Sequence, residues 1–229
     1  MVLLKDVKMK YPGSHAETLR DIDLTIQDGE FVFLVGPSGS GKTTIIKLLT
    51  GEIRATGGQI EVNGFDLRTM KRRNLPKLRR SLGVIFQDYR LIKDMTVYEN
   101  VAFAMRVIGA SNREIKKRVP YVLDLVDLSG REDRYPRERS GGEQQRVAIA
   151  RALVNSPDMI IADEPTGNLD PARSLEIMLL FQKINELGTT VLIVTHEKEL
   201  VNAFSKRVVS LSDGCLISDG MDGYYGYES

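Results

Sequence analysis

The sequence predicts an α/β fold with a mostly parallel sheet, a small antiparallel sheet and an inserted helical segment. An apolar run at 31–35 precedes a turn rich in glycine and serine. Further short apolar runs alternate with segments of helical periodicity, which is the pattern of parallel strands joined by helices. Residues 2–9 and 19–26 instead alternate apolar with polar residues, and the Pro-Gly-Ser turn between them favours an antiparallel pair.

The composition fits one large domain that needs no disulfide. The chain has 229 residues, a formal net charge of +1 and a single cysteine, Cys215, which fits a reducing compartment. This charge gives no nucleic-acid signature. We see no signal peptide, and no uncharged apolar run approaches the ~20 residues of a membrane helix. We therefore expect a chain that is soluble by itself and that needs a partner for any membrane role.

The turn after residues 31–35 fits the phosphate-binding pattern G-x-x-x-x-G-K-[ST]. Its glycines let successive N–H groups point at phosphate oxygens, and the following helix start adds its positive dipole end. A chance match is expected in fewer than about one in a hundred chains of this length. We predict that Lys42 reaches the β- and γ-phosphates and that Thr43 ligates Mg²⁺. The predicted nucleotide-binding residues of this loop are Gly36, Pro37, Ser38, Gly39, Ser40, Gly41, Lys42, Thr43 and Thr44.

Residues 67–87 carry seven arginines and lysines and no acidic residue. Two interpretations stay open: a solvated helix face, or a patch that faces anionic lipid headgroups or an acidic partner. The apolar run within 82–86 is predicted to be a buried strand that ends at Gln87, and helical patterns follow at 97–108 and 114–126.

These patterns predict that the chain is a single domain with three parts. We expect residues 1–87 and 155–217 to form the core, 88–154 to form a helical subdomain, and 218–229 to be a flexible tail.

A third apolar strand, predicted at 159–162, ends in the acids Asp163 and Glu164. A buried strand delivers its C-terminal residues to the ligand crevice of an α/β sheet. We predict that Asp163 holds Mg²⁺ directly or through water, and that Glu164 orients or deprotonates the attacking water. Two acids that simply cap a strand are the alternative, which the phosphate loop about 120 residues earlier disfavours.

A second helix start, Ser140-Gly141-Gly142-Glu143, has the composition of an anion site. The chain thus offers two phosphate-binding helix starts but one catalytic pair of acids. The economical interpretation is a head-to-tail homodimer in which each nucleotide touches both sites.

These motifs resemble the ATP-binding cassette family over essentially the whole chain, and residues 140–144 look like its signature motif. The resemblance implies a P-loop NTPase fold with a RecA-like core, ATP and Mg²⁺ as cofactors, and ATP hydrolysis. It implies that Tyr11 stacks on adenine, that residues 167–170 run between subunits, and that Ser140, Gly141, Gly142 and Glu143 bind nucleotide. It also implies Mg²⁺ ligation by Thr43, Gln87 and Asp163, and catalysis by Glu164, His196, Gln87 and Lys42, with His196 and Gln87 touching the nucleotide.

One position departs from the family pattern. Arg139 stands where the family usually has leucine before the signature serine. A charge there would disturb the packing that leucine provides, or would help to bind nucleotide. Our hypothesis is slow ATP turnover, which Arg139→Leu tests: unchanged turnover in that variant would contradict it.

Residues 163–170 resemble the branch of the family that includes lipoprotein-release, macrolide-efflux and cell-division ATPases. Residues 84–91 and 96–105, and the Gly/Tyr tail at 223–227, look most like the cell-division members. This resemblance implies an FtsX-like permease as integral membrane partner, a cytoplasmic location against the inner face of the cell membrane, and signalling to peptidoglycan hydrolases. It implies no nucleic acid and no direct membrane insertion. The alternatives are the ATPase of a lipoprotein or macrolide exporter and a soluble cassette protein acting on DNA or ribosomes.

Overall fold

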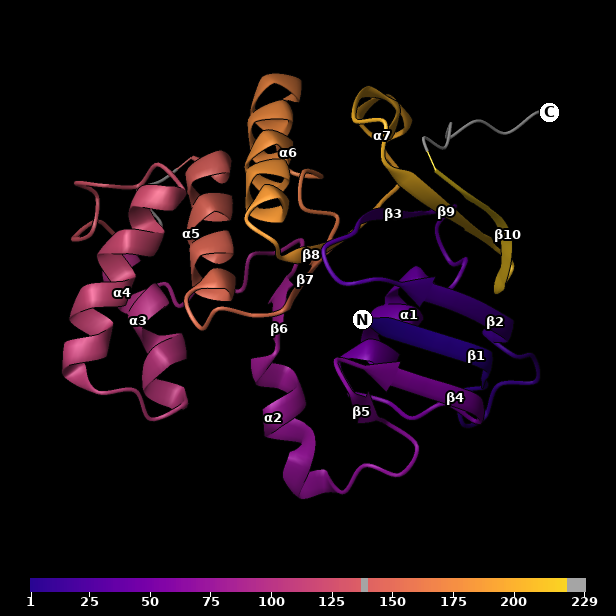
Figure 1. Cartoon of the computed structure of the whole chain (residues 1–229). Coiled ribbons are helices and arrows are strands. Elements are labelled where there is room, and N and C mark those ends of the chain that lie inside the picture. Colours follow the sequence, from indigo (N-terminus) through magenta and orange to yellow (C-terminus); the bar gives the residue numbers. More distant parts are fainter. Residues whose placement is uncertain (137–139, 222–229) are drawn as a thin grey trace.

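The computed structural model describes residues 1–136 and 140–221. Figure 1 shows an antiparallel sheet on one side, a group of three helices on the other, and a second sheet between them. Arg139 and residues 222–229 lie outside the described residues, so the hypothesis about Arg139 stays a prediction. Among the described residues, no helix combines the length and the apolar character needed to cross a bilayer.

The smaller sheet confirms the antiparallel pair predicted near the N-terminus. Its strand order is β2-β1-β4-β5, and all neighbouring strands are antiparallel. The alternating apolar side chains of β1 and β2 face one core cluster, which also includes apolar residues of the first helix. The strands are β1 Val2–Met9, β2 Leu19–Ile26, β4 Gly57–Val62 and β5 Phe65–Asp66.

The larger sheet is mostly parallel, as predicted, with the order β10-β9-β3-β8-β7-β6. All pairs are parallel except β9 with β10. The two central strands β3 and β8 are buried at every residue, which explains why β3 is an unbroken apolar run and why β8 is apolar between its terminal threonines. The strands are β3 Phe31–Val35, β6 Leu82–Ile85, β7 Met159–Asp163, β8 Thr190–Thr195, β9 Arg207–Ser212 and β10 Cys215–Gly220.

The helices fall into two groups. Helices α3 Val97–Val107, α4 Asn112–Leu125 and α5 Gly141–Leu153 come between β6 and β7, and each begins with a capping box. They pack together beside the larger sheet (Figure 1) and share one core cluster with it. The others are α1 Lys42–Leu49, η1 Arg72–Asn74, α2 Leu75–Arg80, α6 Pro171–Glu186 and α7 Lys198–Ala203.

The start of the tail was predicted wrongly. Residues 218–220 belong to strand β10, which pairs with β9. Asp219 forms an ion pair with Arg207, and this pairing across β9 and β10 holds the strand end. The contact joins residues 12 positions apart across a tight turn, and a short polar strand gives no apolar pattern from which to predict it. The remaining domain boundaries stay predictions.

Candidate active site

The phosphate loop joins β3 to α1, and two of its glycines have steric reasons to be glycine. Gly36 has φ +151°, and a Cβ on it would lie 2.1 Å from the backbone oxygen of Leu211. Gly41 caps α1 with φ +110°, and its Cβ would lie 2.6 Å from a methyl group of Leu19. The loop is therefore pressed against β2 and the end of β9, and this contact fixes its curvature.

Lys42, the first residue of α1, folds back over the loop. Its Nζ donates hydrogen bonds to the backbone oxygens of Gly36 at 2.7 Å and Pro37 at 2.9 Å. Burial lowers the pKa of Lys42, while the charges of Glu164 and Asp163 oppose that shift. The ammonium group thus lies between the loop and the two acids.

The two acids lie at the end of β7, whose last residue is Asp163, at the edge where the carboxyl ends of the parallel strands meet. Glu164 has φ +46°, and its backbone N–H donates to the oxygen of Val194 on β8. Its side chain is 14% exposed, and Oε1 lies 2.7 Å from Nδ1 of His196, the residue after β8. The strained backbone therefore directs one carboxylate oxygen at His196, while the other, Oε2, is buried and has no hydrogen-bond partner among the described residues.

Asp163 precedes this pair and lies within the same charge cluster. Burial is the largest cause that raises the pKa of Asp163, and the neighbouring charge of Glu164 adds to it. The positive charges of Lys42 and Arg90 act in the opposite direction.

A cavity of about 750 Å³ brings most of the predicted nucleotide-binding residues together. Three predicted residues of this region do not line it. Gly36 and Ser40 are buried residues of the loop, with Ser40 3% exposed, and Tyr11 contacts a lining residue through its hydroxyl, 3.3 Å from Oγ1 of Thr44. The lining residues are Thr18, Pro37, Ser38, Gly39, Gly41, Lys42, Thr43, Thr44, Gln87, Asp163, Glu164 and His196.

Thr18 is the one lining residue that sequence reasoning missed. It precedes β2, and its backbone N–H bonds to the oxygen of Met9 across the hairpin. No motif marks it, because only the packing of the hairpin against the phosphate loop brings it to the cavity.

The signature residues lie apart from this cavity. Ser140 caps α5 and exchanges hydrogen bonds with Glu143, which also forms an ion pair with Arg131. A Cβ on Gly141 would lie 3.2 Å from a methyl group of Leu169 and 3.4 Å from the backbone oxygen of Asn168. The signature therefore packs on the loop at 167–170 of its own chain, and none of residues 140–144 lines the cavity.

The segment after Gln87 is held by the side chain of Asn168, from the predicted loop at 167–170, and by Arg151, which the motifs do not include. Asn168 Nδ2 donates to the backbone oxygen of Gln87 at 3.0 Å. The guanidinium of Arg151, on α5, donates to the backbone oxygens of Tyr89 at 2.7 Å and Arg90 at 2.6 Å. Both of those residues have positive φ, at +58° and +47°. Burial lowers the pKa of Arg151. Because little water reaches the guanidinium, these two carbonyls are its main hydrogen-bond partners.

Thr43, Gln87 and Asp163 line the same cavity, and together they offer a hydroxyl, an amide and a carboxylate oxygen. Hard oxygen donors of this kind suit Mg²⁺, which is usually bound by one or two protein groups together with phosphates and water. Within the described ranges, no cluster of three His, Cys, Asp or Glu side chains has metal-binding geometry. The residues present therefore fit a cation shared with phosphate rather than an all-protein metal cage.

Comparison with known proteins gives consistent results for family, fold and function. Residues 19–167 match the family model described as ABC transporter. The chain is 51% identical over 226 residues to the cell division ATP-binding protein FtsE of Bacillus subtilis, with 99% of each chain covered. It is also 50% identical over 228 residues to FtsE of Mycobacterium tuberculosis, covering 100% of this chain and 99% of that one.

A solved structure agrees. The ATP-binding cassette MJ0796, determined as a dimer in a post-hydrolysis state bound to ADP and Pi, matches with a TM-score of 0.86 and 35% identity. The match covers 99% of this chain and 100% of that one. The P-loop, RecA-like fold with its antiparallel and helical subdomains is thereby confirmed. The chain belongs to the ABC transporter family of ATP-hydrolysing cassettes, in the group of cell division ATP-binding proteins FtsE.

Proposed function

We propose that the chain hydrolyses ATP with Glu164 acting on the attacking water and His196 holding Glu164 in position. The observation that carries this assignment is the 2.7 Å contact between Glu164 Oε1 and His196 Nδ1 at the edge of the phosphate-loop cavity. The second carboxylate oxygen, which is buried and has no partner among the described residues, would meet the water after a small rotation of the carboxylate toward the cavity. Lys42 neutralises charge that develops on the phosphates.

Thr43, Gln87 and Asp163 would hold Mg²⁺, which supplies positive charge next to the β- and γ-phosphates when bound. The oxygen donors that these residues bring to one cavity support this assignment. Tyr11, whose hydroxyl meets Thr44, would place its ring against the adenine.

The complete site takes two copies of the chain. None of Ser140, Gly141, Gly142 and Glu143 lines the cavity of its own chain, although Ser140 opens a helix start suited to phosphate. A second copy, placed head to tail, would bring its signature to the γ-phosphate. The dimeric state of the similar cassette MJ0796 supports this arrangement. Binding of ATP would then join the subunits, and hydrolysis would release them.

The partner that receives this motion would be an FtsX-like permease, and the complex would signal to peptidoglycan hydrolases during cell division. The cassette itself would lie in the cytoplasm against the inner face of the membrane. The support is the near-complete coverage and 51% identity with FtsE of Bacillus subtilis. An exporter ATPase is less well supported, because the full-length relatives cited above are cell-division proteins. A solved relative, cbiO1 of Clostridium perfringens, is itself part of an ABC transporter complex.

Glu164→Gln tests the assignment of the base. Glutamine has the shape of glutamate but cannot take a proton, so ATP hydrolysis should fall by about 10²–10⁴-fold while ATP binding is retained. Turnover and nucleotide affinity are measured on the same preparation. Glu186→Gln, the same change at the exposed end of α6, is the matched control and should leave turnover unchanged.

Wild-type-like turnover in Glu164→Gln would remove Glu164 from this role. Light scattering in the same background tests the shared site, because trapped ATP should promote dimers. A monomer at every concentration with ATP bound would contradict the two-copy site.

Solubilised membranes that hold the trapped variant test the partner. Recovery of a permease with four membrane spans and a large extracytoplasmic loop would support the cell-division assignment. An exporter-type permease would leave the ATPase chemistry intact and overturn the partner.

A further inference from the structure

The carboxylate of Glu143, in the first turn of α5, has two partners of different kinds. Its Oε2 accepts a hydrogen bond from the backbone N–H of Ser140 at 3.3 Å, which closes the capping box. Its Oε1 forms an ion pair with the guanidinium of Arg131, in the loop between α4 and α5. The side chain of Glu143 is 22% exposed and that of Arg131 is 46% exposed. A cation therefore lies beside the signature, at the surface of the chain.

The loop that carries Arg131 is fixed by backbone hydrogen bonds. The N–H of Arg131 donates to the oxygen of Leu128, whose side chain is buried in the core. Further along the loop, the oxygens of Glu132 and Arg134 accept hydrogen bonds from the first two N–H groups of α3. Arg131 is therefore presented to the signature by a loop that the fold holds in place.

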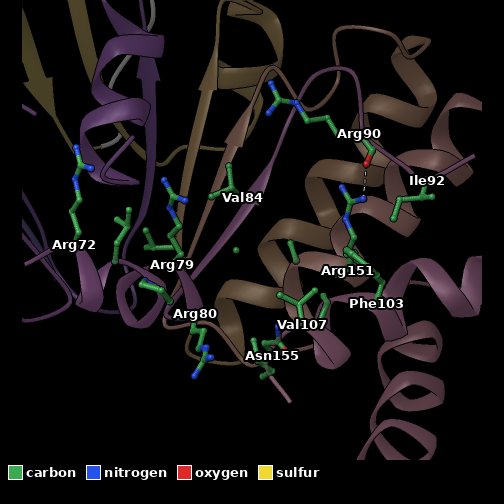
Figure 2. Close-up of a pocket in the computed structure, with 17 residues that line it drawn as sticks. Arg72, Arg79, Arg80, Val84, Arg90, Ile92, Phe103, Val107, Arg151 and Asn155 are labelled. Carbon is green, nitrogen blue, oxygen red and sulfur yellow. Dashed lines mark hydrogen bonds between the residues drawn. The ribbon is translucent and has the colours of Figure 1, made fainter. Parts of the chain in front are cut away.

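Helix α5 keeps its position without this ion pair. Near the C-terminal end of the helix, Arg151 donates to the backbone oxygen of Arg90, and Figure 2 shows this hydrogen bond. In the middle of the helix, Arg146 donates to Asp127 at 2.8 Å and to Glu176 of α6 at 3.1 Å. An ion pair at the surface adds little stability to a helix that is held in this way.

Arg131 does change the charge that the signature presents to a phosphate. At the start of α5, the backbone N–H groups and the helix dipole favour an anion. Glu143 already places one negative charge in this first turn. A phosphate that approaches the helix start is repelled by that carboxylate, and the guanidinium of Arg131 offsets the repulsion.

We infer that Arg131 helps to bind the ATP of a second copy of the chain, because it neutralises Glu143 so that the γ-phosphate does not meet an uncompensated carboxylate. The inference rests on the two-copy site of the proposed function and adds to it a residue outside the sequence motifs. Arg131 does not line the nucleotide cavity of its own chain, so its effect should appear only when two copies meet. Like charges about 6 Å apart near a protein surface change an equilibrium by roughly three- to a hundredfold, according to the effective dielectric constant.

Arg131→Gln in the Glu164→Gln background tests the inference. With saturating ATP and Mg²⁺, light scattering over a series of protein concentrations gives the dissociation constant of the dimer. This constant should rise about tenfold or more, because each dimer contains two signatures that have lost their compensating charge. The affinity of the monomer for ATP and the melting temperature should not change. Arg131→Lys keeps the charge and should recover most of the dimer affinity.

Glu143→Gln separates the effect of charge from that of structure. Glutamine at this position still completes the capping box but carries no charge that needs to be neutralised. In the Glu143→Gln background, Arg131→Gln should therefore leave the dissociation constant of the dimer unchanged. The loss that Arg131→Gln causes alone, relative to the parent at the same salt, should shrink between about 0.05 and about 0.5 M NaCl, because salt screens charge. A merely structural role of Arg131 would give the same loss in both backgrounds and at both salt concentrations.

Arg113→Gln is the matched control. It makes the same change in net charge at an exposed residue of the helical subdomain, near the end of α4 that is remote from the loop of Arg131. A helix of 14 residues is about 20 Å long, which is at least twice the Debye length of about 8 Å at physiological salt. The dissociation constant of the dimer should therefore match that of the parent.

Three results would overturn the inference. Equal losses of dimer affinity in Arg131→Gln and Arg113→Gln, or no loss in either, would do so and leave the two-copy site standing. A loss from Arg131→Gln that persists in the Glu143→Gln background would also leave the two-copy site standing but would assign Arg131 a structural role. If the Glu164→Gln parent itself stays monomeric with ATP bound, the two-copy site is refuted, and the role of Arg131 with it.

Discussion

Replacement of Gly36 by alanine should destabilise the folded protein more than the addition of one methyl group suggests. The new Cβ would lie 2.1 Å from the backbone oxygen of Leu211, a separation that requires the phosphate loop or the end of β9 to move. Such forced shifts in packed regions cost about 1–3 kcal/mol. The φ of +151° adds backbone strain of about 1–3 kcal/mol for a residue with a side chain. We therefore expect a loss of about 2–6 kcal/mol in the free energy of unfolding.

Gly39 is the matched control, because it lies in the same loop with φ +81°, but a Cβ added to it would have no neighbouring atom within 4 Å. Gly39→Ala should bear only the conformational term, about 1–2 kcal/mol. Urea unfolding of both variants without nucleotide gives the two free energies, and their difference measures the steric term. In a chain of this size, each 1 kcal/mol corresponds to about 2–4 °C in melting temperature.

Equal destabilisation by the two alanines would refute the reasoning. It would mean that the contact with Leu211 relaxes freely and that only the dihedral angle requires glycine at position 36. A change in the slope of the urea dependence would instead show that the denatured state had changed, so that slope is compared first.

Three further changes probe the site. Asp163→Asn should abolish hydrolysis yet raise the melting temperature without nucleotide. Because the pKa of the Asp163 carboxyl is raised in the folded protein, its charged form destabilises the fold as pH rises through that pKa. Calorimetry should therefore show the increase in melting temperature near pH 8 and a smaller increase at about pH 4. Arg151→Gln should lower kcat about tenfold or more, because two charge-assisted hydrogen bonds of about 1.5–3 kcal/mol each are lost. Arg151→Lys should restore part of the lost kcat. If Arg151 acts through Gln87, the double variant of Arg151→Gln with Gln87→Ala should lose less kcat than the sum of the two single changes predicts. Tyr11→Ala should raise KM for ATP by about tenfold, since stacking of a base on an aromatic ring is worth about 1–3 kcal/mol. Tyr11→Phe keeps the ring and should leave KM unchanged. Equal effects of the two changes would show that the hydroxyl, which contacts Thr44, binds the nucleotide instead of the ring.

The sequence predicted the parts of the site that lie at the ends of strands. The phosphate loop, Asp163, Glu164 and His196 each follow an apolar run, and such runs form β3, β7 and β8 of one parallel sheet. Because parallel strands end at a common edge, the order of motifs along the chain was enough to bring these residues together. The helical insertion was predictable for a similar reason, since its helices are amphipathic and capped locally.

Other residues depend on tertiary contacts that leave no local pattern. Thr18 enters the cavity because a hairpin packs on the phosphate loop, and Arg151 finds its carbonyl partners about 60 positions earlier in the chain. The charge of residues 67–87 was visible in the sequence, but its meaning was not. Only the position of α2 opposite α3 shows which three of its cations share a cleft with exposed apolar side chains.

The charges of the nucleotide cavity explain why the site favours a ligand that combines anions with a cation. Lys42 directs its ammonium at the oxygens of Gly36 and Pro37, while Asp163 and Glu164 lie side by side at the strand end with only partial compensation. A polyphosphate gives Lys42 a charged partner in place of two neutral carbonyls. A divalent cation offsets the burial, and the smaller repulsion from Glu164, that raise the pKa of Asp163. Each ligand alone would leave one of the two imbalances in place. Nucleotide and Mg²⁺ should therefore bind cooperatively. Asp163→Asn should remove most of the Mg²⁺ dependence of nucleotide affinity and leave the affinity measured without Mg²⁺ nearly unchanged. An undiminished Mg²⁺ dependence in that variant would show that the cation is held elsewhere.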